Sequence, residues 1–349
     1  MAVDGDLRVP LQRVRVVWGR PGDELGVAAL SPHPHRERVA HSGRRTFRDV
    51  VTVDVAPDVR AVDLWDRGRP RQTSGYLIAA PHPAVVDTGP ALSVQIWLEA
   101  FRDLGIALAD VAYVIVTHIH LDHAGGAGVL LSHLPAARVV VHRRGARHLA
   151  DPRRLVAGAG QVFGDKLQAY FGLPEPVPEA RLLVPEGEGE LDLGGGHRLR
   201  FFDAPGHARH QHMILDVGTG CLFSGDELGG RFVDIADDYV LPDAAPNQFD
   251  PDAMLRSARL LLALRPRAVL LGHFGRYPRD CATLSVRLRD QVEAFAALGR
   301  TRSHPATLEE VRARLVEHVC RDLEGWGVSW GPAVERELAE HLDLSLIHI

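Results

Sequence analysis

The stretch from Val111 to Gly126 decides the fold. It opens with an apolar run at 111–116 and continues without a break as Thr117-His118-Ile119-His120-Leu121-Asp122-His123-Ala124-Gly125-Gly126. A short apolar run of this kind predicts a strand that is buried on both faces. Three imidazoles and one carboxylate therefore follow directly on the end of a buried strand, within six residues.

A turn after a strand can aim these side chains at alternate sides. His118 and His120 then bind one ion, while Asp122 and His123 reach another. Imidazole suits zinc and iron(II), and a carboxylate adds a hard oxygen donor and a negative charge. A solvated turn that happens to be rich in histidine is the alternative interpretation, and the close spacing argues against it.

The pattern resembles the signature Thr-His-x-His-x-Asp-His-x-Gly-Gly of the metallo-β-lactamase superfamily. The four other markers of that family occur in the same order over residues 85–273, as Val85-Val86-Asp87-Thr88-Gly89, Ala204-Pro205-Gly206-His207, Phe223-Ser224-Gly225-Asp226 and Leu271-Gly272-His273. The resemblance implies an α/β fold: a four-layer αββα sandwich of two similar halves, with a C-terminal helical extension. The site would lie at the strand ends along one edge.

The resemblance also implies which residues bind metal. One ion would be held by His118, His120 and His207, and the other by Asp122, His123 and His273. Asp226 would lie between the two ions, and Asp87 would buttress the metal-binding loop from outside. The cofactors expected are two divalent ions, zinc first, with iron and manganese as alternatives.

Two adjacent cations lower the pKa of a shared water, so a metal-bridging hydroxide forms near neutral pH and attacks an ester or thioester carbonyl. Asp122 would orient this nucleophile. The layout is most similar to glyoxalase II-like (hydroxyacylglutathione hydrolase-like) enzymes, although their usual substrate-binding basic residues cannot be mapped onto this chain. A lactonase is one alternative. A persulfide dioxygenase-type oxidoreductase with a single iron, held by two His and an Asp, is another.

Four segments are expected along the chain. Residues 1–48 are interpreted as an N-terminal extension that is flexible or begins at a misplaced start codon, with a docked strand pair that includes Leu11 to Trp18 as the alternative. Residues 49–280 are interpreted as the metallo-β-lactamase domain. Residues 281–343 read as a C-terminal helical segment. Residues 344–349 resemble a translated sequencing adapter and are interpreted as an artefact.

Individual elements are expected as well. Ser93 should cap a helix that ends at Gly105, and Thr307 should open a capping box with Glu310. The proline-rich stretch 143–189 should form helices and loops that cover the site. Strands are expected at 51–55, where alternating valines predict a half-buried strand, and at 76–80, 84–86, 111–116, 138–141, 198–202, 213–217, 221–224 and 268–271. A further helix is expected at 251–264.

The composition limits the kinds of binding partner that are expected. The formal net charge is −5, which favours neither nucleic acid nor an anionic membrane surface, so a small-molecule substrate is expected. Three widely spaced cysteines imply no disulfide framework and favour the cytoplasm. A homo-oligomer is left open. His210 and His212 are expected on the surface or in the core rather than in the pocket, and His133, His142, His148 and His197 are expected to be structural or solvated.

Overall fold

The computed structural model describes residues 51–185, 189–244, 248–300 and 308–336, together with 338 and 342. The predictions for residues 1–48, Thr307 and residues 344–349 lie outside this part of the chain. None of the helices in the described residues is long and apolar enough to cross a bilayer.

The first sheet has seven strands in chain order. Strands β1 to β4 pair antiparallel, whereas β4 to β7 pair parallel. The strands are β1 (Thr52–Ala56), β2 (Val59–Asp63), β3 (Ser74–Ile78), β4 (Ala84–Val86), β5 (Tyr113–Ile115), β6 (Arg138–Val140) and β7 (Leu182–Leu183).

The second sheet has six strands in the order β15-β14-β11-β10-β9-β8. Its members are β8 (Glu190–Gly194), β9 (His197–Asp203), β10 (His212–Asp216), β11 (Cys221–Gly225), β14 (Ala268–Leu271) and β15 (Gly275–Arg276). Only β11 and β14 pair parallel. A separate ribbon pairs β12 (Gly230–Arg231) with β13 (Val240–Leu241).

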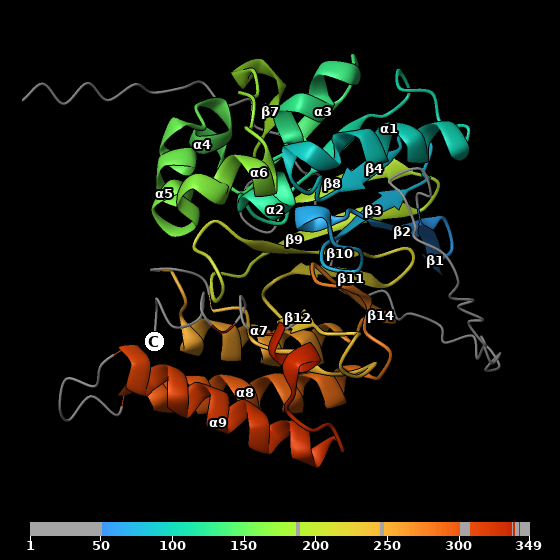
Figure 1. The fold of residues 1–349 in the computed structure, drawn as a ribbon. Helices are drawn as coiled ribbons and strands as arrows, with labels where there is room; N and C mark the ends of the chain where they lie inside the picture. The colour runs from blue at the N-terminus through green and yellow to red at the C-terminus, as the bar shows by residue number, and fades with distance from the viewer. Residues whose placement is uncertain are drawn as a thin grey trace, which may run out of the picture.

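Helices cover the outer faces of both sheets (Figure 1). On the side of the first sheet lie α1 (Val94–Asp103), α2 (Leu121–Ala124), α3 (Ala127–His133), α4 (Ala146–Ala150), α5 (Arg153–Phe163) and α6 (Leu167–Phe171). On the side of the second sheet lie α7 (Pro251–Leu264), α8 (Cys281–Arg300) and α9 (Leu308–Gly325).

Three apolar layers hold this arrangement together. Trp97 and Phe101 of α1 are fully buried against the outer face of the first sheet. Between the sheets, Tyr76 and Phe223 meet edge to face with ring centroids 5.3 Å apart. On the far side, Leu288 of α8 shares a cluster with α7 and the second sheet. The expected αββα sandwich with a C-terminal helical part is therefore confirmed.

Some local expectations need correction. Ser93 occupies the N-cap position of α1, but its hydroxyl donates to the Leu64 carbonyl (2.6 Å) and not to the helix, so α1 lacks a side-chain cap. Residues 51–55 were expected to alternate as a half-buried strand, yet Val53 is exposed and only Val55 is buried. A register shift between Asp54 and Ala56 breaks the alternation.

Candidate metal centre

The chemistry-bearing residues follow the carboxyl ends of parallel strands. Asp87 follows β4, and His118 comes three residues after β5, its parallel neighbour. In the second sheet Asp226 follows β11, and His273 comes two residues after β14, again its parallel neighbour. Parallel strands end on the same edge of a sheet, so the topology gathers side chains from both sheets at one edge.

One group of donors consists of His118, His120 and His207. Their donor atoms all lie within 4.8 Å of one another. His207 Nε2 lies 2.9 Å from His120 Nδ1, and the His118 and His207 rings meet edge to face at 4.9 Å. His118 and His207 are buried, whereas His120 is half-buried.

A second group consists of Asp122, His123 and His273, again with donor atoms within 4.8 Å of one another. Asp122 Oδ2 lies 3.5 Å from Nε2 of both His123 and His273. These two nitrogens are 3.2 Å apart. The structure thus brings together the three residues that the sequence assigned to a second ion.

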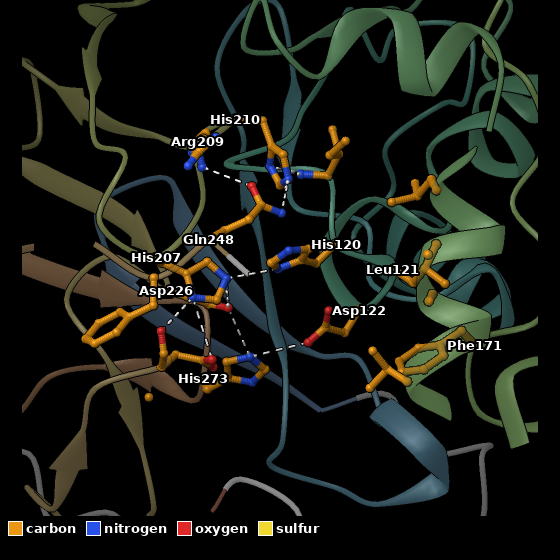
Figure 2. A pocket seen from close by; sticks show the side chains of 18 of the residues that line it. His120, Leu121, Asp122, Phe171, His207, Arg209, His210, Asp226, Gln248 and His273 are labelled. Carbon is orange, nitrogen blue, oxygen red and sulfur yellow. Dashed lines mark hydrogen bonds and ion pairs between the residues drawn. The ribbon is translucent and has the colours of Figure 1, made fainter. Parts of the chain in front are cut away.

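Asp226 lies between the two groups (Figure 2). Its Oδ2 is 3.6 Å from His118 Nε2 and 3.5 Å from His207 Nε2 in the first group. It is 3.2 Å from His123 Nε2 and 3.6 Å from His273 Nε2 in the second. One carboxylate oxygen therefore faces both groups at similar distances.

The donor set fits two metal ions. His118 Nε2 and Asp226 Oδ1 are buried and have no hydrogen-bond partner among the described residues. A buried polar atom without a partner costs about 1–3 kcal/mol, so such atoms in a working site call for a ligand. Imidazole nitrogens that face one another within 3.2 Å are likewise explained by a cation between them.

Contacts outside the cluster orient the rings. In four of the imidazoles Nδ1 faces a protein oxygen while Nε2 faces the cluster, and this arrangement selects the tautomer that presents a lone pair to a metal. The Nδ1 partners are Thr117 Oγ1 for His118 (3.1 Å), Asp87 Oδ2 for His123 (3.1 Å), the Asp243 carbonyl for His207 (2.8 Å) and the Gln72 carbonyl for His273 (2.9 Å).

Asp87 joins the marker after β4 to the metal-binding loop. Its carboxylate accepts bonds from the Thr117 backbone N–H (2.7 Å) and hydroxyl (2.8 Å), and it contacts His123 Nδ1. The residue has a φ of 58°, a left-handed conformation that Asp adopts more readily than most residues. Asp87 thus lies where the sequence placed it, supporting the loop from outside the cluster.

Electrostatics inside the cluster favour an enclosed positive charge. Burial lowers the pKa of His118, and the neighbouring His123 lowers it further. Burial alone would also lower the pKa of His123, but the Asp226 and Asp122 carboxylates raise it well above its usual value. Burial would raise the pKa of Asp226, yet His123 and His273 hold it well below its usual range. The buried carboxylates therefore attract a cation, either protons on the imidazoles or metal ions.

Sequence reasoning missed two residues. Asp243 forms a further possible metal-binding group with His207 and Asp226, and nothing in its sequence context signals this role. Glu227 is buried and accepts bonds from the backbone N–H groups of Gly206 and His207 (both 2.9 Å). Burial raises the pKa of Glu227 to about 8. The position of Glu227 directly after Asp226 was the only sequence feature that could have indicated this role.

His210 is nearer the site than expected. It is buried, lines the cavity over the cluster, and its ring meets that of His120 edge to face at 5.1 Å. His148 also lines this cavity and is half-buried, which agrees with the expectation of a structural or solvated residue. His212 has a core position, with Nε2 2.9 Å from the Val116 carbonyl.

The cavity above the cluster measures about 1460 Å³. His120, Asp122, His207, Asp226 and His273 lie at its floor, so a substrate in it reaches the proposed metal ligands. Part of its lining is apolar: Leu121, Leu155, Phe163 and Phe171 pack in one cluster, and Val162 also lines the cavity. The stretch 143–189 supplies much of this wall, as the sequence predicted.

The sequence model of the Metallo-beta-lactamase superfamily matches residues 68–273, and the chain belongs to this superfamily. The fold agrees with this membership, since the structure is similar to that of metallo-beta-lactamase family protein TTHA1429 from Thermus thermophilus. That likeness has a TM-score of 0.62 at 20% identity and covers 84% of this chain and 93% of the other.

Curated relatives are similar over part of their length. Metallo-beta-lactamase fold-containing protein ST1585 of Sulfurisphaera tokodaii is 33% identical over 47% of this chain and 60% of its own. Putative diflavin flavoprotein A 2 of Synechocystis is 28% identical over 58% of this chain and 32% of its own. Thioesterase pkgB of Emericella nidulans is 28% identical over 48% of this chain and 38% of its own length. The chain therefore spans 60% or less of the length of these relatives.

Proposed function

We propose that this chain is a dinuclear metal-dependent hydrolase of ester or thioester bonds, of the hydroxyacylglutathione hydrolase-like type. One observation carries the proposal. Asp226 Oδ2 lies within 3.6 Å of imidazole nitrogens from both donor groups, the position of a carboxylate shared by two ions. Zinc is the proposed metal, since imidazole and carboxylate donors suit it.

The residues divide the work. His118, His120 and His207 would hold one ion, Asp122, His123 and His273 the other, and Asp226 both. When bound, such a pair lowers the pKa of water toward neutrality and polarises a carbonyl oxygen. Asp122 lines the cavity and would orient the attacking water by accepting its hydrogen bond.

Thioesters are the favoured substrates. Water adds to the carbonyl carbon, the C–S bond breaks, and a carboxylate, a thiol and a proton balance the reaction. A thiolate leaves without help from a strong general acid, so the residues named above suffice. A relative that is named a thioesterase supports this class.

A redox enzyme is the second candidate, because relatives of this chain include putative diflavin flavoproteins. Metal identity separates the two classes. Zinc in the purified protein with thioester turnover supports the hydrolase. The proposed hydrolase would be wrong, and an oxidoreductase would take its place, if the purified protein contained iron, consumed oxygen and hydrolysed no ester, thioester or lactone.

The mechanism is tested by Asp122→Ala. We expect about two metal ions per wild-type chain, and a fall in kcat of about 100-fold or more in the variant, as for loss of a residue that positions a proton. Metal content by mass spectrometry and turnover of matched ester, thioester and lactone panels are the measurements.

Asp110→Ala is the matched control, because Asp110 is exposed and remote from the cavity lining. It should keep both metal content and turnover. Wild-type turnover in Asp122→Ala would refute the assigned role of Asp122.

A further inference from the structure

Five of the arginine side chains that line the cavity come from one region beside the metal centre. We call these five the arginine wall. They belong to the loop after β6, to α4 and α5, and to the loop before β10: Arg143, Arg144, Arg147, Arg154 and Arg209. This basic surface was not expected from the net charge of −5.

The arginine wall lacks carboxylate partners. Within the described part of the chain, none of its guanidinium groups forms an ion pair with Asp or Glu. The protein partners it does have are uncharged, namely the Arg209 carbonyl for Arg144 Nη1 (3.2 Å) and His148 Nε2 for Arg147 Nε (3.2 Å). By contrast, the neighbouring Arg153 is ion-paired with Asp151 at 2.5 Å and does not line the cavity.

The arginine wall adjoins the donor cluster. The Arg209 backbone N–H donates to Gln248 Oε1 (3.2 Å), and Gln248 Nε2 lies 3.4 Å from His210 Nε2. His210 in turn packs against His120. Figure 2 shows Gln248 between Arg209 and His210, with His120 next to them. A ligand that touches the wall therefore extends to the reacting centre.

Guanidinium groups in this number concentrate positive charge in the cavity. The charge is felt locally, because the pKa of His148 is lowered first by burial and then by Arg147 and Arg154. Arginine binds phosphate and carboxylate oxygens with paired N–H donors, and phosphate groups carry more charge per group. Five cations without carboxylate partners match a ligand with several negative charges better than one or two carboxylates.

We propose that the arginine wall binds the phosphate groups of a thiol carrier, so that the substrate is an acyl thioester of a phosphorylated thiol. The inference rests on the thioester hydrolysis of the proposed function, and it replaces glutathione by a phosphorylated thiol as the carrier of the acyl group. The cavity volume of about 1460 Å³ agrees with a substrate of this size, because it exceeds the roughly 300–1,000 Å³ of ordinary small-ligand pockets. The apolar part of the lining, which includes Phe171 of α6, would receive the acyl group.

Turnover of matched thioesters tests the substrate class. One acyl group is offered on coenzyme A, on glutathione and on the uncharged N-acetylcysteamine. We expect kcat/KM to be at least about tenfold higher for coenzyme A than for either other carrier, through KM, as expected for charge-assisted hydrogen bonds. Equal kcat/KM values, or preference for glutathione or N-acetylcysteamine, would overturn the proposal.

Variants locate the effect. The double substitution Arg147→Gln with Arg154→Gln should raise KM for the coenzyme A thioester about tenfold and leave the N-acetylcysteamine thioester unchanged. Arg153→Gln, one residue away and outside the cavity, is the control. An equal rise in KM in the double variant and in the control would show a general effect of surface charge and would contradict the assignment of phosphate binding to the arginine wall.

A binding measurement separates this inference from the proposed hydrolysis. Adenosine 3′-phosphate 5′-diphosphate lacks a thioester and is titrated calorimetrically into the metal-loaded chain. Binding that weakens about tenfold in the double variant, and not in Arg153→Gln, supports the arginine wall even where no thioester is hydrolysed. No binding to the wild type, or tighter binding and cleavage of a short single-stranded RNA, would contradict it.

Discussion

His212 shows how a single titratable residue can tie stability to pH without joining the metal centre. It is buried, its Nε2 lies 2.9 Å from the Val116 carbonyl, and its ring packs on Phe201 with centroids 5.0 Å apart. Burial, aided by His142, lowers the pKa of His212 to about 3. The folded state therefore keeps this imidazole neutral over a range in which the unfolded chain protonates it.

The sign of the pH effect follows. The contribution is fully present above the unfolded pKa of about 6.5, and stability falls as pH drops from there toward 3. At one pKa unit per 1.36 kcal/mol, acidification from pH 7 to pH 5 should cost about 2 kcal/mol through His212. His212→Gln, which keeps a side-chain N–H donor, should remove this part of the pH dependence.

Urea unfolding of wild type and His212→Gln at pH 7, 6 and 5 measures the effect. The difference between the two proteins isolates the contribution of His212 from those of all other ionisable groups. Parallel stability curves for the two proteins would show that folding does not lower the pKa of His212.

At the scale of elements, short turns after the strands set the separation of the donors. Gly272, between β14 and His273, passes so close to the cluster that a Cβ there would lie 2.4 Å from Asp226 Oδ1 and 2.7 Å from His123 Cε1. Gly225 has a φ of +51°, and a Cβ there would meet Thr117 Oγ1 at 2.6 Å. The glycines of two markers are thus needed for close approach between the sheets.

Gly272→Ala should therefore push Asp226 or His123 out of place. We expect a loss of about 1–3 kcal/mol of stability from overpacking, and loss of at least one metal ion per chain. Metal analysis after gel filtration, together with thermal unfolding, measures both effects.

Gly160→Ala is the matched control for that substitution. Gly160 lies in α5, and a Cβ there meets nothing within 4 Å. Alanine in a helix interior should then stabilise the chain by about 0.5–1 kcal/mol and leave the metal content unchanged. Full metal occupancy in Gly272→Ala would show that the turn can relax.

At the scale of the whole molecule, the centre joins the two sheets. The ligands proposed here follow β5 in the first sheet and β9, β11 and β14 in the second. Bound ions would therefore cross-link both halves of the sandwich and relieve the buried, unpartnered His118 Nε2 and Asp226 Oδ1. Metal binding and folding should be thermodynamically linked.

Removal of the metal tests this linkage. With free metal at about 1,000 times Kd, each bound ion adds about 4 kcal/mol, which corresponds to roughly 10 °C in Tm per ion for a domain of this size. Calorimetric scans of the metal-loaded chain and of the chelator-treated chain measure the shift, and zinc added back should restore it. An unchanged Tm would mean that the folded chain does not bind the ions more tightly than the unfolded chain, and it would contradict the proposed metal centre.

Much of the layout was predictable because its signals are local. Each marker lies on one strand end and its turn, so the markers could be recognised in the sequence, and their resemblance to those of the family implied the sandwich and the residues that gather at its edge. The bounds of β4, α7 and β14 agree with their hydrophobic patterns. Ser93 was misjudged because a distant carbonyl, that of Leu64, competes for its hydroxyl.

The sequence by itself determined the family, the sandwich, and which side chains carry metal-binding chemistry, since donors and turns lie within a few residues of one another. Only the tertiary structure decided that Asp243 approaches the cluster, that Glu227 holds the His207 turn, and that Arg209 joins the arginines of α4 and α5 in one wall. These groups come from segments far apart in the chain. Packing of the two sheets brings them together, and no local pattern reports that packing.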